Sequence, residues 1–122
     1  MNRIALLSLL TLTACATDPE EAVSIDQGVY GLTLSGCDVG NCDDEPYADA
    51  RVTATPTSGA PLSTTSDGDG FFELALPAGT YELCVHGCTT ITIGDGERAR
   101  RDFVSGPGGG IWCSDGACRP GG

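Results

Sequence analysis

The most informative absence in this chain of 122 residues is lysine, because all six basic residues are arginine. Without lysine, the chain has no Schiff-base nucleophile, no P-loop lysine and no lysine for an isopeptide crosslink. Seventeen acidic residues outnumber the arginines and give a formal net charge of -11. A phosphate backbone would be repelled by this charge, so the composition argues against nucleic-acid binding.

Side chains for catalysis are scarce as well. The one histidine, His86, stands between Val85 and Gly87 in an expected turn, and no serine or thiol is marked as its nucleophilic partner. We therefore expect His86 to be a turn or surface residue. The chain is long enough for one small domain only. We expect no enzyme activity, no catalytic residue and no cofactor.

No apolar run is long enough to cross a membrane as a helix. The longest run, Ile4 to Leu12, follows Arg3 and is about half of the roughly 20 residues that such a helix needs. A positive head, a short apolar run and small residues after it are typical of a secretory signal that is cleaved. The run ends in Leu12-Thr13-Ala14-Cys15.

This tetrad resembles the lipobox of bacterial lipoproteins. The resemblance implies that residues 1–14 are a signal peptide, that Cys15 is linked to diacylglycerol, and that its new amine is acylated, for example with palmitate. Ala16 stands where an aspartate would favour retention in the inner membrane, so we expect an outer-membrane location. The alternative is an ordinary cleaved signal, after which Cys15 would pair with another thiol.

Residues 15–27 are expected to form an acidic tether. Residues 16–27 carry four acids and no base, and Pro19 is expected to block an early helix. Twelve such residues have a root-mean-square reach of about 20 Å. The domain would then float just clear of the lipid headgroups, and its acidity disfavours contact with an anionic surface.

Residues 28–104 alternate in polarity with period two, which is typical of short antiparallel strands. Two further strands are expected over Leu62 to Thr65 and Arg98 to Val104. The side chains expected to point into the core are Tyr30, Leu32, Leu34, Ala50, Val52, Ala54, Phe72, Leu74, Leu76, Tyr81, Leu83, Val85, Ile91 and Ile93. The pattern predicts an all-β fold, a small antiparallel β-sandwich of six or seven strands.

One stretch of this segment carries a second resemblance. Its residues are Asp67-x-Asp69-Gly70-x-Phe72-x-Leu74-x-Leu76-Pro77-x-Gly79-x-Tyr81-x-Leu83-x-Val85. They resemble the signature of carboxypeptidase regulatory-like domains, which implies a transthyretin-like (prealbumin-like) sandwich over residues 28–104. Most members of that family are non-catalytic modules, so the resemblance implies a structural or binding role. Asp67 and Asp69 are expected to shape a turn, because the later acidic ligands of a calcium loop are missing.

The odd count of seven cysteines becomes even once Cys15 carries lipid. The six that remain form three close pairs, Cys37 with Cys42, Cys84 with Cys88, and Cys113 with Cys118. Each pair brackets a turn, so we favour local disulfides, although the sequence does not choose among the possible pairings. No metal site is expected, because no pair is C-x-x-C and exported thiols are oxidised.

Four residues are candidates for ligand contact. Arg98, Arg100 and Arg101 could meet a carboxylate or phosphate, or could protect an edge strand and pair with Asp95, Glu97 or Asp102. Trp112 lies in the Gly-rich tail, residues 105–122, beside the Cys113 to Cys118 loop. It could be an exposed contact residue, or it could fold back onto the sandwich.

The expected function is that of a lipid-anchored, non-catalytic structural or binding module of the cell envelope. Its expected partners are the membrane, through the lipid, and a protein or a glycan. Two alternatives remain open: a carbohydrate- or peptide-binding module, and a small disulfide-rich protease inhibitor that presents the Cys113 to Cys118 loop.

Overall fold

The structure is a computed structural model, and it describes residues 19–36, 45–106 and 110–114. One short helix and nine strands lie in these ranges. They are α1 (Pro19–Ala22), β1 (Gly28–Ser35), β2 (Glu45–Pro46), β3 (Arg51–Pro56), β4 (Leu62–Thr65), β5 (Phe71–Ala75), β6 (Gly79–Cys84), β7 (Cys88–Ile93), β8 (Arg98–Ser105) and β9 (Ile111–Ser114). The prediction of an all-β fold is confirmed. The strand number exceeds the expected six or seven, because β2 and β9 lie in segments that were expected to be loop and tail.

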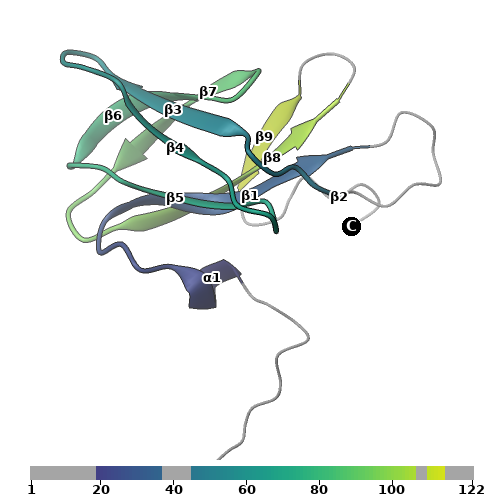
Figure 1. The fold of residues 1–122 in the computed structure, drawn as a ribbon. Coiled ribbons are helices and arrows are strands. Elements are labelled where there is room, and N and C mark those ends of the chain that lie inside the picture. The colour runs from purple at the N-terminus through teal and green to yellow at the C-terminus, as the bar shows by residue number, and fades with distance from the viewer. Residues whose placement is uncertain (1–18, 37–44, 107–109, 115–122) are drawn as a thin grey trace, which may run out of the picture.

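The strands form two sheets that face each other (Figure 1). The five-stranded sheet has the order β2-β1-β8-β9, and β5 pairs with β1 beside β2. The four-stranded sheet has the order β4-β3-β6-β7. Strands β1 and β8 pair in parallel, and every other pairing in the described ranges is antiparallel. The first and last long strands are therefore neighbours in the middle of one sheet.

The core lies between the inner faces of the two sheets. Every second side chain along a strand points inward, and these inward side chains are mostly apolar and buried. Eleven of the expected core side chains are buried: Tyr30, Ala50, Val52, Ala54, Phe72, Leu74, Leu76, Tyr81, Leu83, Ile91 and Ile93. Val85 is half-buried and packs against this cluster. Period-two alternation thus identified the inward face of β3, β5, β6 and β7 correctly.

Tyr30, Leu32 and Leu34 share one face of β1, as expected, and Tyr30 is buried, but this face is not the one that packs in the core between the sheets. Val29 and Thr33 are fully buried, and Val29 belongs to the core, so Leu32 and Leu34 lie on the opposite face and are half-buried. The inward Thr33 is tolerated because its hydroxyl lies within hydrogen-bond distance of the backbone carbonyls of Tyr47 (2.7 Å) and Gly70 (3.0 Å). Alternation alone misleads where both faces of a strand are covered.

Gly31 lets β1 approach β8 closely. A Cβ at this position would lie 1.8 Å from the backbone oxygen of Arg101, so no other residue fits without a shift of the strands. At the next position the amide of Leu32 donates to the Asp102 carboxylate at 3.0 Å. Asp102 is almost fully buried, and its side chain thus satisfies a backbone group in the middle of the sheet.

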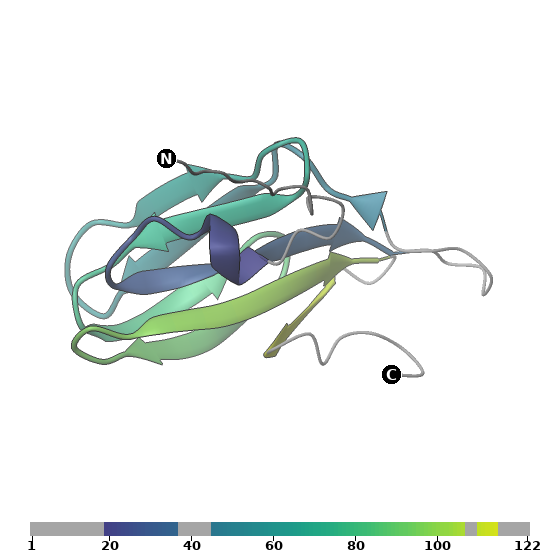
Figure 2. The ribbon, with the colours of Figure 1, turned by 90° about the horizontal axis from the view of Figure 1, so that it is seen from below.

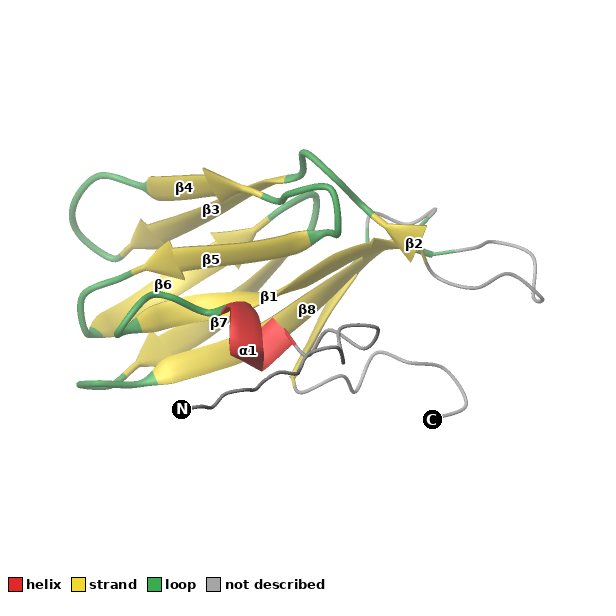
Figure 3. Cartoon of the chain, turned by 60° about the horizontal axis from the view of Figure 1, so that its bottom comes forward, coloured by secondary structure: helices red, strands yellow, loops and turns green. Residues whose placement is uncertain are grey.

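The segment before β1 lies on the outer face of the five-stranded sheet, where α1 contacts β1 (Figure 3). A helix that begins at Pro19 contradicts the expectation that this proline would block one. The first helical position tolerates proline because its amide would have no intrahelical partner there. Within the described ranges, no helix is long and apolar enough to span a membrane.

Candidate functional site

The hairpin of β6 and β7 carries a disulfide between Cys84 and Cys88, so local pairing is confirmed for this pair. The two cysteines face each other across the strands, with their Cα atoms 4.1 Å apart. Cys113 is also disulfide-bonded. The remaining cysteines of the prediction, Cys37, Cys42 and Cys118, lie outside the described residues, as does Cys15.

The exposed carboxylate of Glu82 stands beside this disulfide, with its oxygen within 4.8 Å of the sulfur atoms of Cys84 and Cys88. Three such groups would suit a soft metal only if the sulfurs were thiolates. Because the two sulfurs are bonded to each other, the group offers a metal one carboxylate and no thiolate.

A row of five aromatic rings leads from the surface beside this hairpin into the core. The successive ring pairs are Tyr47 with His86 (centroids 5.7 Å apart), His86 with Phe103 (6.2 Å), Phe103 with Trp112 (4.9 Å) and Trp112 with Phe72 (6.2 Å). The Tyr47 hydroxyl lies 2.7 Å from Nε2 of His86. His86 is exposed in the turn between β6 and β7, as expected, while Phe103 and Phe72 are buried.

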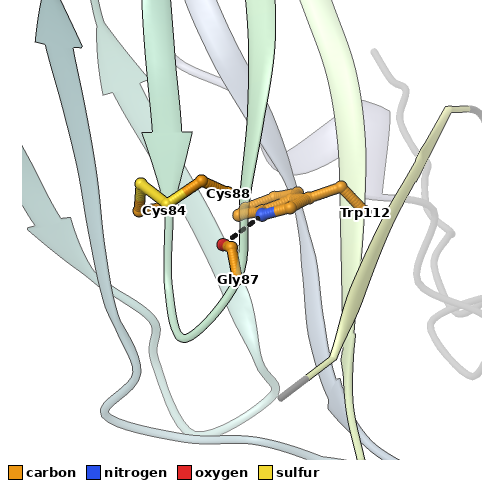
Figure 4. Close-up of a disulfide and its surroundings, with 4 residues drawn as sticks. All are labelled: Cys84, Gly87, Cys88 and Trp112. Atoms are coloured by element: carbon orange, nitrogen blue, oxygen red, sulfur yellow. Dashed lines mark hydrogen bonds between the residues drawn. A yellow bond between two sulfur atoms is a disulfide. The ribbon is translucent and has the colours of Figure 1, made fainter. Parts of the chain in front are cut away.

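Trp112 packs inward from β9 against this row. Its indole nitrogen donates to the backbone carbonyl of Gly87 at 2.8 Å, directly beside the disulfide (Figure 4). The side chain is half-buried and packs on the core, and Trp112 pairs with Phe103 across β9 and β8. Of the two interpretations left open, the structure thus has Trp112 folded back onto the sandwich. It ties the tail to the β6–β7 turn.

This placement predicts the fluorescence of the folded protein. Trp112 is the one tryptophan of the chain. Because its ring is packed against Phe103 and its N–H is paired, we expect blue-shifted emission in buffer and a red shift in denaturant. A Trp112→Phe variant removes the signal and serves as the blank. Emission of the native protein at the wavelength of free tryptophan would contradict the packed position.

The three arginines do not form one cluster. Arg100 makes a bidentate pair with Asp102, with contacts of 3.2 and 3.0 Å. Arg101 alternates to the other face of β8 and donates to the backbone carbonyl of Arg100 at 2.7 Å. Arg98 is exposed at the start of β8. Pairing with a neighbouring acid, one of the two expected roles, is therefore observed for Arg100.

The Asp67 to Gly70 turn has the geometry expected of a structural turn. The Asp67 carboxylate accepts the backbone amides of Asp69 (2.9 Å) and Phe71 (3.0 Å). The backbone amide of Asp67 donates to the carbonyl of Phe71, and the amide of Gly70 donates to the carbonyl of Asp67. Gly70 has a φ of 81°, a conformation that favours glycine. The side chain of Asp67 thus closes the connection between β4 and β5.

A shallow groove of about 410 Å³ lies at one end of the sandwich, between the β3–β4 and β5–β6 loops. Leu62 and Tyr81 line it together with Pro56, Ala60 and Pro77. Leu62 is 39% exposed, and no acidic or basic side chain among the described residues lines the groove. The groove can offer apolar contact and backbone hydrogen bonds, but no charged group for catalysis.

Glu73 on β5 holds the N-terminal segment against the sandwich. Its carboxylate accepts the amide of Ser24 (2.7 Å), the hydroxyl of Ser24 (2.8 Å) and the amide of Ile25 (3.2 Å). Partial burial raises the pKa of Glu73, but these hydrogen bonds favour the charged form and leave the pKa below its ordinary value. Gln27 adds bonds to the Leu76 carbonyl (2.9 Å) and the Gly96 amide (2.7 Å).

These contacts predict a pH-dependent attachment. Because the folded pKa of Glu73 is lowered, the attachment is fully stabilised above the ordinary pKa of glutamate, about 4.3, and weakens as the pH falls through the lower folded value. We expect amide-exchange protection of Ser24 and Ile25 at neutral pH and its loss in acid. In Glu73→Gln the protection should be reduced at neutral pH, and the two proteins should become alike in acid, where Glu73 is protonated. Protection that is equal in the two proteins at neutral pH would contradict the role of Glu73.

Three of these contacts join residues that are distant in the sequence. Tyr47 and His86 are 39 positions apart, Ser24 and Glu73 are 49 apart, and Leu32 and Asp102 are 70 apart. No local pattern marks these residues.

Comparison of the chain with protein-family models, with curated proteins and with solved structures found no significant match.

Proposed function

We propose that this protein is a lipid-anchored cell-envelope protein whose prealbumin-like β-sandwich acts as a non-catalytic structural or binding module. The observation that carries the proposal is the tetrad Leu12-Thr13-Ala14-Cys15 at the end of a short apolar run. One acyl chain holds a protein only marginally at a membrane, whereas two or three hold it stably at about 0.8 kcal/mol per buried CH₂. The outer membrane is the proposed location, because Ala16 follows the cysteine.

The fold supports the role of a module. The core packs between two sheets, and α1 begins four positions after Cys15, the proposed lipid site. The Asp67 turn and the alternating core residues of β5 and β6 belong to the stretch on which the resemblance to carboxypeptidase regulatory-like domains depends, and their turn and strand geometry supports the proposal. The Cys84–Cys88 disulfide suits an exported protein, whose thiols are oxidised.

Lipid labelling in the cells that make the protein tests the anchor. We expect radiolabelled palmitate to enter the mature chain, and globomycin, which blocks the lipoprotein signal peptidase, to accumulate the longer precursor. Mass spectrometry should find the modification on an N-terminal peptide that begins at Cys15. A mature chain without lipid, or one whose N-terminus lies elsewhere, would refute the proposal.

The threonine face is a candidate contact surface for a glycan or a peptide. We define it as the outer face of the four-stranded sheet, where strand register places the hydroxyl side chains of Thr53, Thr55, Ser63, Thr65, Thr80, Thr90 and Thr92. Most of them are exposed. The hydroxyl oxygens of Thr80 and Thr92 lie 3.1 Å apart. Hydroxyl groups can donate and accept hydrogen bonds with sugars or a peptide backbone. The alternative of a protease inhibitor depends on the loop ending at Cys118, which lies outside the described residues.

A further inference from the structure

The outer face of the five-stranded sheet, opposite the threonine face, carries the N-terminal segment. We call it the α1 face. Strand register places on it Phe71 and Glu73 of β5, Tyr30, Leu32 and Leu34 of β1, Arg98, Arg100, Asp102 and Val104 of β8, and Ile111 of β9. Leu32, Leu34, Phe71 and Val104 are half-buried, and Ile111 is 59% exposed, the most exposed large apolar side chain in the described ranges. The two outer faces of the sandwich therefore differ: one is rich in hydroxyls and the other is partly apolar.

The N-terminal segment is held on the α1 face and does not leave the sandwich at the start of β1. Gln27 is bonded at one end of the sheet, and Ser24 is bonded to Glu73 in the middle of β5. Helix α1 then lies over β1 when the molecule is viewed from that side (Figure 2). The chain thus enters the sandwich across the middle of this face.

Covalent geometry limits how far the proposed lipid can be from α1. Cys15 precedes Pro19 by four residues, and four Cα steps span at most about 15 Å. A helix packed on a sheet has a diameter of about 10 Å, and the second sheet lies about 10 Å beyond the first. The threonines of β3, β6 and β7 therefore lie roughly 20 Å from α1, beyond the reach of Cys15, while α1 stays on its sheet. Thr65 at the β4 edge is nearer, because it lines the same pocket as Ala22 of α1.

We propose that the α1 face lies against the lipid headgroups of the membrane and that the threonine face is directed away from it. The expected free tether, which would keep the domain clear of the headgroups, is shortened because Ser24, Ile25 and Gln27 are bonded to the sandwich. This inference rests on the proposed lipid anchor at Cys15. The apolar side chains of the α1 face, Ile111 above all, suit the boundary between headgroups and acyl chains. The exposed Arg98 can meet lipid phosphates there, whereas the exposed Glu21 and Asp26 oppose deep insertion. The acyl chains, not electrostatic attraction, hold the face in place.

Paramagnetic relaxation measures this orientation without a new cysteine. The lipidated full chain is placed in nanodiscs of phosphatidylethanolamine and phosphatidylglycerol that contain a gadolinium-chelating lipid. We expect the amides of Leu32, Leu34 and Ile111 to relax several-fold faster than those of Thr53, Thr80 and Thr92. Equal enhancement on both faces, or a larger one on the threonine face, would overturn the orientation. A chain that does not float with lipid vesicles at all would overturn the anchor, and the orientation with it.

Two matched variants test the role of the attached segment. Glu73→Gln weakens the hold on Ser24 and Ile25, so the difference in relaxation between the two faces should shrink while flotation with vesicles is kept. Glu82→Gln changes an exposed carboxylate among the threonines and should leave the difference unchanged. If both variants keep the full difference, the attachment by Glu73 does not set the orientation.

Discussion

Replacing Cys15 by alanine is expected to reduce the incorporation of palmitate to background and to remove the mature protein from the membrane fraction. The thioether forms through the cysteine sulfur, and alanine offers no nucleophile to accept diacylglycerol. Each CH₂ group of an acyl chain contributes about 0.8 kcal/mol of membrane affinity. A protein without any acyl chain should therefore leave the membrane fraction completely. The measurements are palmitate labelling and partition into the detergent phase of a cloud-point extraction.

Thr17→Ala is the matched control, since it changes a neighbouring polar residue outside the tetrad. It should be labelled and partitioned like the unchanged chain. Labelling of the Cys15→Ala protein would show that the lipid is attached elsewhere. If the unchanged chain also fails to take up palmitate, the sequence has only an ordinary signal peptide.

Replacing Phe103 by alanine is expected to cost about 3–5 kcal/mol of the free energy of unfolding. Phe103 is fully buried, and its ring contacts Trp112 and His86 in the row of aromatic rings. Gly110 also approaches it: a Cβ there would lie 2.4 Å from its ring. The cavity would therefore separate β9 from the sandwich as well as weaken the core. Since a small domain has about 5–15 kcal/mol in total, this variant would be close to unfolding.

Phe71→Ala is the control for this variant, because Phe71 has the same side chain but lies half-buried on the α1 face. Its cost should be clearly smaller, since less apolar surface is lost. Denaturant unfolding, followed by circular dichroism, gives both free energies with the Cys84–Cys88 disulfide intact. A Phe103→Ala cost no larger than that of Phe71→Ala would mean that the ring row does not stabilise the fold.

The strands could be predicted from the sequence where one face of the strand is buried and the other is exposed to solvent. Val52 and Ala54 alternate with polar residues in β3, and Leu83 does so in β6, so period two marks the core directly. In β1 this signal fails, because Leu32 and Leu34 lie half-buried on the outer face, where α1 contacts the strand. Alternation reports which residues share a face, and it does not report which face is inside.

The candidate site could be predicted only where its parts are close in sequence. Cys84 and Cys88 bracket a turn, so their pairing follows from chain geometry. For Trp112 the sequence leaves two interpretations open, because the position of the side chain depends on a hydrogen bond to Gly87, 25 residues earlier. Contacts of this kind depend on how the strands are ordered in the sheets, which a local pattern does not contain.

The sequence by itself determined the all-β class, the excess of acidic residues, the local cysteine pair of the β6–β7 hairpin and the tetrad that ends at Cys15. Each of these depends on composition or on neighbours within a few residues. Only the tertiary structure decided the parallel pairing of β1 with β8, the inward Trp112 and the hold of Glu73 on Ser24. The physical reason is that these contacts form between segments brought together by burial of the common core, and the free energy of that burial belongs to the whole sandwich.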